Sequence, residues 1–397
     1  MKKIFYYIFL VFTSFYGYTQ EINSTTYPFQ SSFGNVLEDM STGTTQLIEP
    51  TRNNGSSGQL HDIGFDFFLA TTRFTQYDVS PNGFIRLGEL VSLPSITNNL
   101  NANSQSPCIA PYWDYIFVSS QGKVHAKTIG SAPNRKLVVE WKNMRIPGIG
   151  DISTGNATFQ LWLSETSGKI EFVYGAGMVF NNSNGGYTVG FNRTGTNFSS
   201  VQVINSIAGH FASVNNNTTG IGNGRKFAFT PPIPNAPFDL QITNVTDTGM
   251  RLAWTPNGTT YTRYVIYGST DSGNTYNYFT QLSGFSHIFR DLQPGTIYHW
   301  RIHNLSSGGL SNPLEGIQTT NPAAPPVTTW TGNENTIWNN ADNWTNGVPA
   351  NNSEVIIPAG LARYPDIIEK ISIKSLKLEN GATINVANGV ELNITGM

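Results

Sequence analysis

The chain has 397 residues, and this length exceeds what one hydrophobic core usually organises, so two to three domains are expected. Charged residues make up only 12%, while hydrophobic residues reach 39% and aromatic residues 12%, a balance that excludes an intrinsically disordered chain. Lys and Arg number 23 against 25 Asp and Glu, a net charge of −2. That charge argues against nucleic acid as a partner, since binding it requires a basic surface.

Residues 1–20 are typical of a secretory signal peptide. Lys2 and Lys3 supply the positive start, and an apolar run of nine residues follows from Ile4 to Phe12. This run is far shorter than the ~20 apolar residues that span a bilayer. We therefore expect an exported protein, secreted or at the cell surface, with no transmembrane segment after cleavage. An uncleaved anchor is the alternative.

Residues 21–230 alternate short apolar runs with Gly, Asn and Ser clusters, which predicts two packed antiparallel sheets. Apolar residues fall at every second position from Phe159 to Leu163 and from Ile170 to Tyr174, on either side of a Ser-Gly turn, and predict a hairpin. Strands are predicted at Asp78–Leu87, Lys123–Thr128, Lys136–Asn143, Ala157–Ser164, Lys169–Tyr174 and Tyr187–Phe191.

Four segments of this region carry a family resemblance. They are Ser80–Gly88 (SPNGFIRLG), Ile109–Asp114 (IAPYWD), the hairpin Phe159–Tyr174 and Val189–Phe191 (VGF). In order and spacing they resemble a nidogen-like extracellular domain, which implies an adhesive or matrix-type module and not an enzyme. The family pattern carries a second acidic residue after Trp-Asp, but Tyr115 stands there, which argues against a shared metal or ligand site.

A proline-rich linker is predicted at residues 231–235, because proline fixes φ and removes a backbone donor. Residues 236–320 resemble a fibronectin type III domain, with Trp254 as its core tryptophan. Their LQPGTIY string, Leu292–Tyr298, matches that family's corner. Pro-Gly makes the turn there, and the Tyr298 hydroxyl can satisfy a nearby backbone group.

A second linker is predicted at residues 321–328, before the segment 329–397. Short strands every five to ten residues predict the first coils of a parallel β-helix or the start of a repeat, with a truncated gene product left open. The predicted strand runs are Val355–Pro358, Ile371–Ile373, Leu376–Leu378, Thr383–Val386 and Val390–Ile394. We expect Trp330, Trp338 and Trp344 to cover an open end of these coils.

No catalytic motif stands out, and we predict that the chain is not an enzyme and binds no cofactor or metal. His299 and His303 lie about 13 Å apart on a strand, too far to ligate one ion, and we expect both to face solvent. Asp151–Asn156 and Asp271–Asn274 are read as turns and not calcium loops. Cys108, the single cysteine, is expected to be a small buried residue. The acids available for a glycosidase pair are Asp62, Asp66, Asp78, Asp114, Glu140, Glu165 and Glu171.

The candidates for ligand binding are Tyr112, Trp113, Asp114 and Tyr115. The rings could stack a sugar while the carboxylate accepts hydrogen bonds from its hydroxyls. In the alternative interpretation, Trp113 fills the space between the two sheets.

The predicted fold class is all-β: a β-sandwich, a fibronectin type III (immunoglobulin-like) sandwich and a short C-terminal β-solenoid-like segment. The predicted function is non-enzymatic adhesion or binding, with glycans, matrix proteins or cell-surface proteins as partners. Two alternatives stay open: an accessory or carbohydrate-binding portion of a secreted hydrolase, and a purely structural spacer.

Overall fold

The computed structural model describes residues 27–50, 55–93, 97–101, 103–146, 155–178, 186–209, 217–258, 263–323 and 326–396. The predicted signal peptide lies outside these ranges. Within them the chain is all-β, as predicted, and its helical residues form only short 3-10 turns. We find no helix in these ranges with the length and apolarity that a membrane crossing requires.

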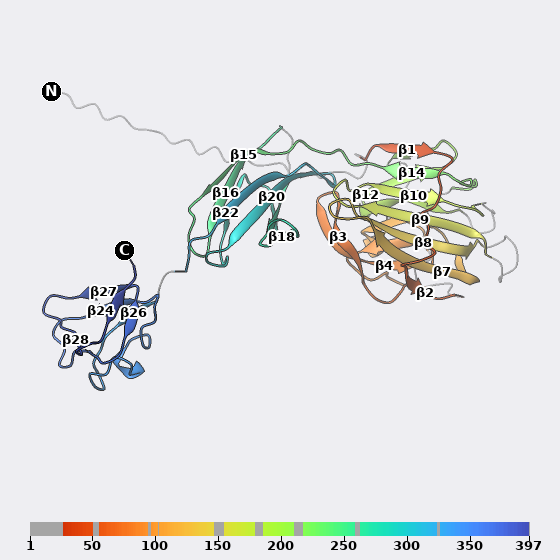
Figure 1. The fold of residues 1–397 in the computed structure, drawn as a ribbon. Helices are drawn as coiled ribbons and strands as arrows, with labels where there is room; N and C mark the ends of the chain where they lie inside the picture. The colour runs from red at the N-terminus through yellow and green to blue at the C-terminus, as the bar shows by residue number, and fades with distance from the viewer. Residues whose placement is uncertain are drawn as a thin grey trace, which may run out of the picture. The chain divides into compact units, whose positions relative to one another are not determined.

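The first domain contains a seven-stranded antiparallel sheet in the order β1-β14-β10-β9-β8-β7-β2 (Figure 1). The predicted hairpin is confirmed, because Leu163 pairs with Ile170 and Phe159 pairs with Tyr174. The strands of this sheet are β1 (Phe29–Ser32), β2 (Thr45–Ile48), β7 (Phe117–Ile129), β8 (Lys136–Arg145), β9 (Ala157–Ser164), β10 (Ile170–Tyr174) and β14 (Lys226–Phe229).

A second seven-stranded antiparallel sheet has the order β13-β12-β11-β6-β5-β4-β3. The prediction of one strand over Asp78–Leu87 is wrong, because a turn at Gly83 divides it into β4 and β5. Gly83 has φ +83°, and a Cβ there would lie 1.9 Å from the Tyr112 carbonyl oxygen, so only glycine fits. The strands are β3 (His61–Leu69), β4 (Thr72–Ser80), β5 (Phe84–Leu87), β6 (Cys108–Trp113), β11 (Thr188–Thr194), β12 (Asn197–Gln202) and β13 (Ile207–Gly209).

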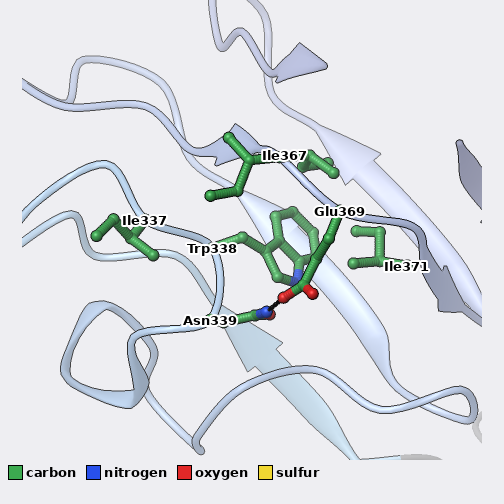
Figure 2. Close-up of a pocket in the computed structure, with 7 residues that line it drawn as sticks. Ile337, Trp338, Asn339, Ile367, Glu369 and Ile371 are labelled. Atoms are coloured by element: carbon green, nitrogen blue, oxygen red, sulfur yellow. Dashed lines mark hydrogen bonds between the residues drawn. The ribbon is translucent and has the colours of Figure 1, made fainter. Parts of the chain in front are cut away.

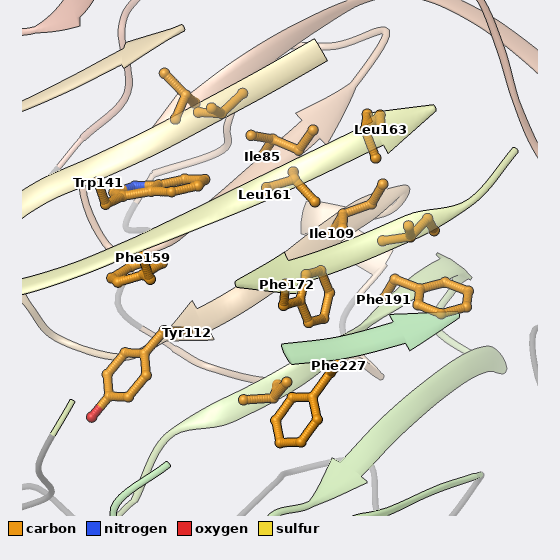
Figure 3. Packing of buried hydrophobic residues seen from close by; sticks show 14 of the residues in the cluster. Ile85, Ile109, Tyr112, Trp141, Phe159, Leu161, Leu163, Phe172, Phe191 and Phe227 are labelled. Carbon is orange, nitrogen blue, oxygen red and sulfur yellow. The ribbon is translucent and has the colours of Figure 1, made fainter. Parts of the chain in front are cut away.

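The inward-facing side chains of both sheets form one apolar core (Figure 3). Trp141 stacks on Phe159 in this core, with ring centroids 5.2 Å apart, and its indole N–H donates to the Ser80 carbonyl at 2.9 Å. A second cluster covers the opposite side of β6 and includes Val91 and Leu100. Strand β6 is therefore buried on both faces.

The fibronectin-like region has two sheets. One has the strand order β18-β17-β20-β21, and β22 also pairs with β20. The other has the order β15-β16-β19. Two predictions are confirmed: Trp254 is buried against Tyr264, and the Tyr298 hydroxyl accepts the Gln293 N–H at 2.9 Å. The strands are β15 (Phe238–Thr243), β16 (Met250–Thr255), β17 (Arg263–Ser269), β18 (Asn277–Leu282), β19 (Ser286–Phe289), β20 (Ile297–Ser306), β21 (Gly309–Leu310) and β22 (Leu314–Thr319).

The C-terminal segment pairs its strands in parallel, in three small sheets: β23-β24-β27, β25-β28 and β26-β29. The partners in β24 and β27 lie 21 residues apart, as Glu354 and Ser375 do. The turn of the chain that leads from β24 to β27 therefore adds one strand to each of the three sheets. The strands are β23 (Val327–Thr329), β24 (Glu354–Ile357), β25 (Asp366–Ile367), β26 (Ile371–Ile373), β27 (Ser375–Leu378), β28 (Asn385–Val386) and β29 (Leu392–Ile394).

The three tryptophans of this segment are buried together. Trp344 contacts the rings of Trp330 and Trp338 edge-on, with centroids 4.9 and 4.7 Å away. The Trp344 indole N–H donates to the Trp338 carbonyl at 2.7 Å, and that of Trp330 to the Arg363 carbonyl at 2.8 Å. Both indole donors are therefore satisfied by backbone carbonyls, as buried tryptophans require.

Candidate functional site

The predicted aromatic cluster at the end of β6 is largely buried. Tyr112 faces the core between the sheets and stacks on Tyr187, with centroids 4.4 Å apart. Trp113 points to the opposite side, where it packs on Phe84 at 4.4 Å. The interpretation of Trp113 as a buried packing residue is confirmed, but the ring lies on the outer side of β6 and not between the sheets, because alternation along β6 gives that place to Tyr112. Neither ring offers a face to a sugar in this conformation.

The other two candidates differ from each other in exposure. Asp114 is 5% exposed, and its carboxylate accepts the Tyr115 N–H at 2.7 Å. Burial raises the pKa of the Asp114 carboxyl to about 6. Tyr115 is 37% exposed and packs edge-on against Phe117. Of the four predicted residues, Tyr115 is thus the one that offers a ring to solvent.

Asp78, on β4, holds two loops of the first domain in place. Its carboxylate is fully buried and accepts the Val79 N–H at 2.7 Å, the Val91 N–H at 2.8 Å and the Ser57 hydroxyl at 2.5 Å. The Ser57 N–H also lies 3.2 Å from this carboxylate. A carboxylate with this many donors is a structural anchor for the segments around Ser57 and Val91.

A groove of about 260 Å³ opens where edge strands β2 and β3 of the two sheets lie. This volume is close to the lower end of ligand pockets, ~300 Å³. The groove combines hydrogen-bonding groups of several kinds with a few apolar side chains. Its lining residues are Thr45, Leu47, His61, Asp62, Tyr77, Ala126, Lys127, Thr128 and Leu137.

The charged and titratable side chains of this groove are already oriented. Asp62 accepts a hydrogen bond from the Gln76 side chain at 3.0 Å, and Lys127 donates to the Asp39 carbonyl. Burial lowers the pKa of His61, so the imidazole is neutral at pH 7. The negative charge of the Asp62 carboxylate and the positive charge of the Lys127 ammonium therefore cancel. The groove suits a neutral ligand rich in hydroxyl or amide groups.

A serine and a histidine lie together beside the groove, with Ser57 Oγ and His61 Nε2 2.8 Å apart. The single hydroxyl proton of Ser57 points to the Asp78 carboxylate, the closest acceptor at 2.5 Å. The imidazole must then donate its Nε2 proton to Ser57. This is the reverse of a catalytic pair, in which the histidine accepts the serine proton.

The acids considered as catalytic candidates are each held by a donor group in the same domain. Such pairing is typical of structural carboxylates and leaves no unengaged acid among these candidates. The carboxylates and their partners are Asp62 with Gln76, Asp66 with Arg73, Asp78 with Ser57, Asp114 with the Tyr115 N–H, Glu140 with His125, Glu165 with Arg135, and Glu171 with Lys169 and Lys226.

A buried polar network on the first sheet was not predicted. His125 Nε2 lies 2.6 Å from Glu140, and Gln160 donates to the same carboxylate at 2.8 Å. Gln160 also binds the Glu38 backbone through both its amide oxygen and its nitrogen. The three side chains come from β7, β8 and β9, so they meet only through strand register, which sequence alone does not give. Through Gln160, this network binds the backbone at Glu38 to the sheet.

The remaining candidates have structural roles. His303 is buried, contrary to expectation, and its Nδ1 lies 2.8 Å from the Ser311 carbonyl. Asp271 binds its own turn through the Ser269 and Thr275 hydroxyls, as predicted. Cys108 is buried as predicted, and burial raises its pKa to about 12. Part of the predicted turn 151–156 lies outside the described residues.

The C-terminal segment has a smaller pocket of about 90 Å³ beside Trp338 (Figure 2). Ile337, Ile367 and Ile371 surround it, and Asn339 donates to Glu369 at its rim. Its volume holds only a few water molecules. Across the described residues, no three His, Cys, Asp or Glu side chains form a group that could hold a metal ion.

Three family models match consecutive parts of the chain. They are NIDO related over residues 26–231, fibronectin type III domain over 235–320, and a domain of unknown function (DUF8693) over 329–397.

Three individual proteins illustrate the similarity, and each match covers a quarter of this chain or less. Human Roundabout homolog 3 is 33% identical over 113 residues, which are 25% of this chain and 8% of that protein. The fibronectin type III domain of human collagen XX is 26% identical, with a TM-score of 0.21, over 22% of this chain and 97% of that one. The rat CD45 extracellular region d3–d4 is 14% identical, with a TM-score of 0.21, over 23% and 54%. Because the first family model covers more than half of the 397 residues, the chain belongs to the NIDO-related family.

Proposed function

We propose that this chain is a secreted or cell-surface binding protein of β modules that acts in adhesion without catalysis. A nidogen-related domain followed by a fibronectin type III domain favours an extracellular binding role. The proposal depends on one observation about the first domain. Each candidate acid there is bound by a structural partner, which favours the absence of catalysis, while a polar groove beside β2 and β3 remains open to a ligand.

The groove is the proposed contact for a ligand. Asp62 and Thr128 are exposed at its surface, and His61 and Lys127 are half-buried within it. Together they offer hydrogen-bond donors and acceptors with no excess of either charge. Glycans have the complementary chemistry, because each sugar carries several hydroxyls that both donate and accept. A groove of about 260 Å³ would hold one end of such a ligand.

The test is binding of residues 21–397 to arrays of glycans and matrix proteins, with wild type beside Asp62→Ala. We expect selective binding by the wild type and weakening by at least about tenfold in the variant, because a hydrogen bond to a charged group contributes roughly 1.5–3 kcal/mol. Glu49→Ala is the matched control. Glu49 is also an exposed acid with a glutamine hydrogen bond, to Gln46 at 2.6 Å, but it does not line the groove.

The same arrays separate the alternatives. Binding that both variants retain would contradict the groove as the contact. Absence of binding to every array member would favour the purely structural spacer. Binding to polysaccharide alone would favour the carbohydrate-binding portion of a secreted hydrolase.

A further inference from the structure

The floor of the polar groove in the first domain lies between the inner faces of the two sheets. On the first sheet, Thr128 pairs with Leu137 and lies two positions after Ala126, so these three side chains share a face. On the second sheet, Tyr77 pairs with His61. All five residues line the groove, and Ala126, Leu137 and Tyr77 belong to the core between the sheets. The groove therefore reaches down to core side chains of both sheets.

Tyr77 differs from other buried tyrosines of this domain in its hydroxyl. Tyr174 donates to the Pro111 carbonyl at 2.7 Å, and Tyr187 donates to the Thr219 carbonyl at 2.6 Å. Tyr77 is only 1% exposed, yet its hydroxyl forms no hydrogen bond with any residue that the structure describes. Buried hydroxyls are normally paired. A partner for Tyr77 must therefore come from the groove, which this residue lines.

The surroundings of this hydroxyl combine apolar side chains with one acceptor. Burial raises the pKa of Tyr77, so the oxygen keeps its proton and can donate it to a ligand. Ala126 and Leu137 are buried beside the groove, and Leu47 packs against the same core. Asp62 is exposed, and its carboxylate can accept more hydrogen bonds than the one it receives from its glutamine neighbour. The groove thus offers an inner donor, apolar walls and an outer acceptor.

We propose that the groove binds the acetamido group of an N-acetylated sugar, an inference that rests on the proposed function and names its ligand class. Each part of an acetamido group has a counterpart here. The carbonyl oxygen accepts the Tyr77 hydroxyl proton, the N–H donates to the Asp62 carboxylate, and the methyl group packs against Ala126 and Leu137. A sugar that carries only hydroxyls has no apolar substituent to place among these side chains. The group is also neutral, as the balanced charges of the groove require.

An array of glycan pairs, with matrix proteins on the same surface, tests this inference. The two members of a pair differ at one ring carbon, which carries an acetamido group in one and a hydroxyl in the other, as in N-acetylglucosamine and glucose or N-acetylgalactosamine and galactose. Residues 21–397 are applied as wild type, Tyr77→Phe and Tyr174→Phe.

The two variants separate a ligand contact from a structural one. Tyr77→Phe removes the unpaired hydroxyl and keeps the ring in the core. Tyr174→Phe is the matched control, because Tyr174 is buried in the same core and does not line the groove, and its hydroxyl binds the Pro111 carbonyl. Urea unfolding of each variant reports its stability.

We expect the wild type to bind the acetamido member of a pair about tenfold or more tightly than the hydroxyl member. Tyr77→Phe should weaken binding of the acetamido member by about fivefold or more and keep the wild-type unfolding midpoint, because its hydroxyl has no protein partner. Tyr174→Phe should unfold at lower urea concentration and keep the wild-type preference.

The outcomes distinguish this inference from the proposed function. Equal binding of both members of the pairs, or a wild-type preference in Tyr77→Phe, would overturn the acetamido assignment and leave a binding role in place. Binding confined to the matrix proteins would do the same. A lower unfolding midpoint for Tyr77→Phe would show that its hydroxyl is structural and would also overturn the assignment. Absence of binding to every glycan and protein would overturn the proposed function and this inference together.

Discussion

Replacing Asp78 by alanine tests the assignment of this carboxylate as the anchor of two loops. The substitution deprives the buried N–H groups of Val79 and Val91 of an acceptor. Each unsatisfied buried donor costs about 1–3 kcal/mol, so the first domain should lose roughly 2–6 kcal/mol. The Ser57 N–H loses less, since it also donates to the Val79 carbonyl at 2.9 Å. The Ser57 hydroxyl can turn to the Gln59 carbonyl, 3.0 Å away.

Hydrogen exchange read by mass spectrometry suits this prediction, because the whole chain has several domains and does not unfold in one step. Peptides that contain Ser57 and Val91 should exchange faster in Asp78→Ala, and the first domain should unfold at lower urea concentration. Asp62→Ala, which removes one exposed hydrogen bond, should change neither readout by more than about 0.5 kcal/mol. Equal exchange in wild type and Asp78→Ala would refute the anchor role.

Three further predictions follow from buried groups. Tyr298→Phe removes the acceptor of the Gln293 N–H and should lower the stability of the fibronectin-like domain by about 1–2 kcal/mol in urea unfolding; an unchanged midpoint would contradict this role. Because burial raises the folded pKa of Asp114 to about 6, above the usual ~3.9, the contribution of Asp114 to the free energy of unfolding should fall as pH rises from about 4 to 6. Asp114→Asn should therefore stabilise at pH 7 and have little effect at pH 4; equal effects at both pH values would refute this. The Cys108 thiol should react with maleimide only as fast as the first domain unfolds, and rapid labelling of the native protein would contradict its burial.

Local patterns sufficed for the hairpins and corners of this fold. Alternation from Phe159 to Tyr174 predicted β9, β10 and their turn, since both strands and the connection lie within one short segment. The corner at Tyr298 was predictable for the same reason. The turn that divides Asp78–Leu87 also had a local signal, because Asn82-Gly83 is a common hairpin turn. Apolar residues alternate on both sides of this dipeptide, as they do in a single strand, so the pattern predicted one strand and not two.

Features that depend on distant segments could not be predicted. Trp113 is buried on the outer side of β6 because the segment with Val91 and Leu100 folds over that face, and no pattern near Trp113 indicates this. The groove brings His61 and Asp62 of one sheet to Lys127 of the other. Lys127 follows His61 and Asp62 by more than sixty positions, and the three side chains meet only through the packing of the two sheets.

The most direct test of the account is product analysis with the intact chain. Residues 21–397 are incubated with polysaccharide and peptide mixtures, and mass spectrometry follows both the bound fraction and any cleavage products over time. Because the candidate carboxylates are held by structural partners and His61 donates to Ser57, the account predicts a retained ligand and no product above the protein-free control. Products that accumulate with time and disappear in Ser57→Ala, or in a variant of any of the paired acids, would contradict it.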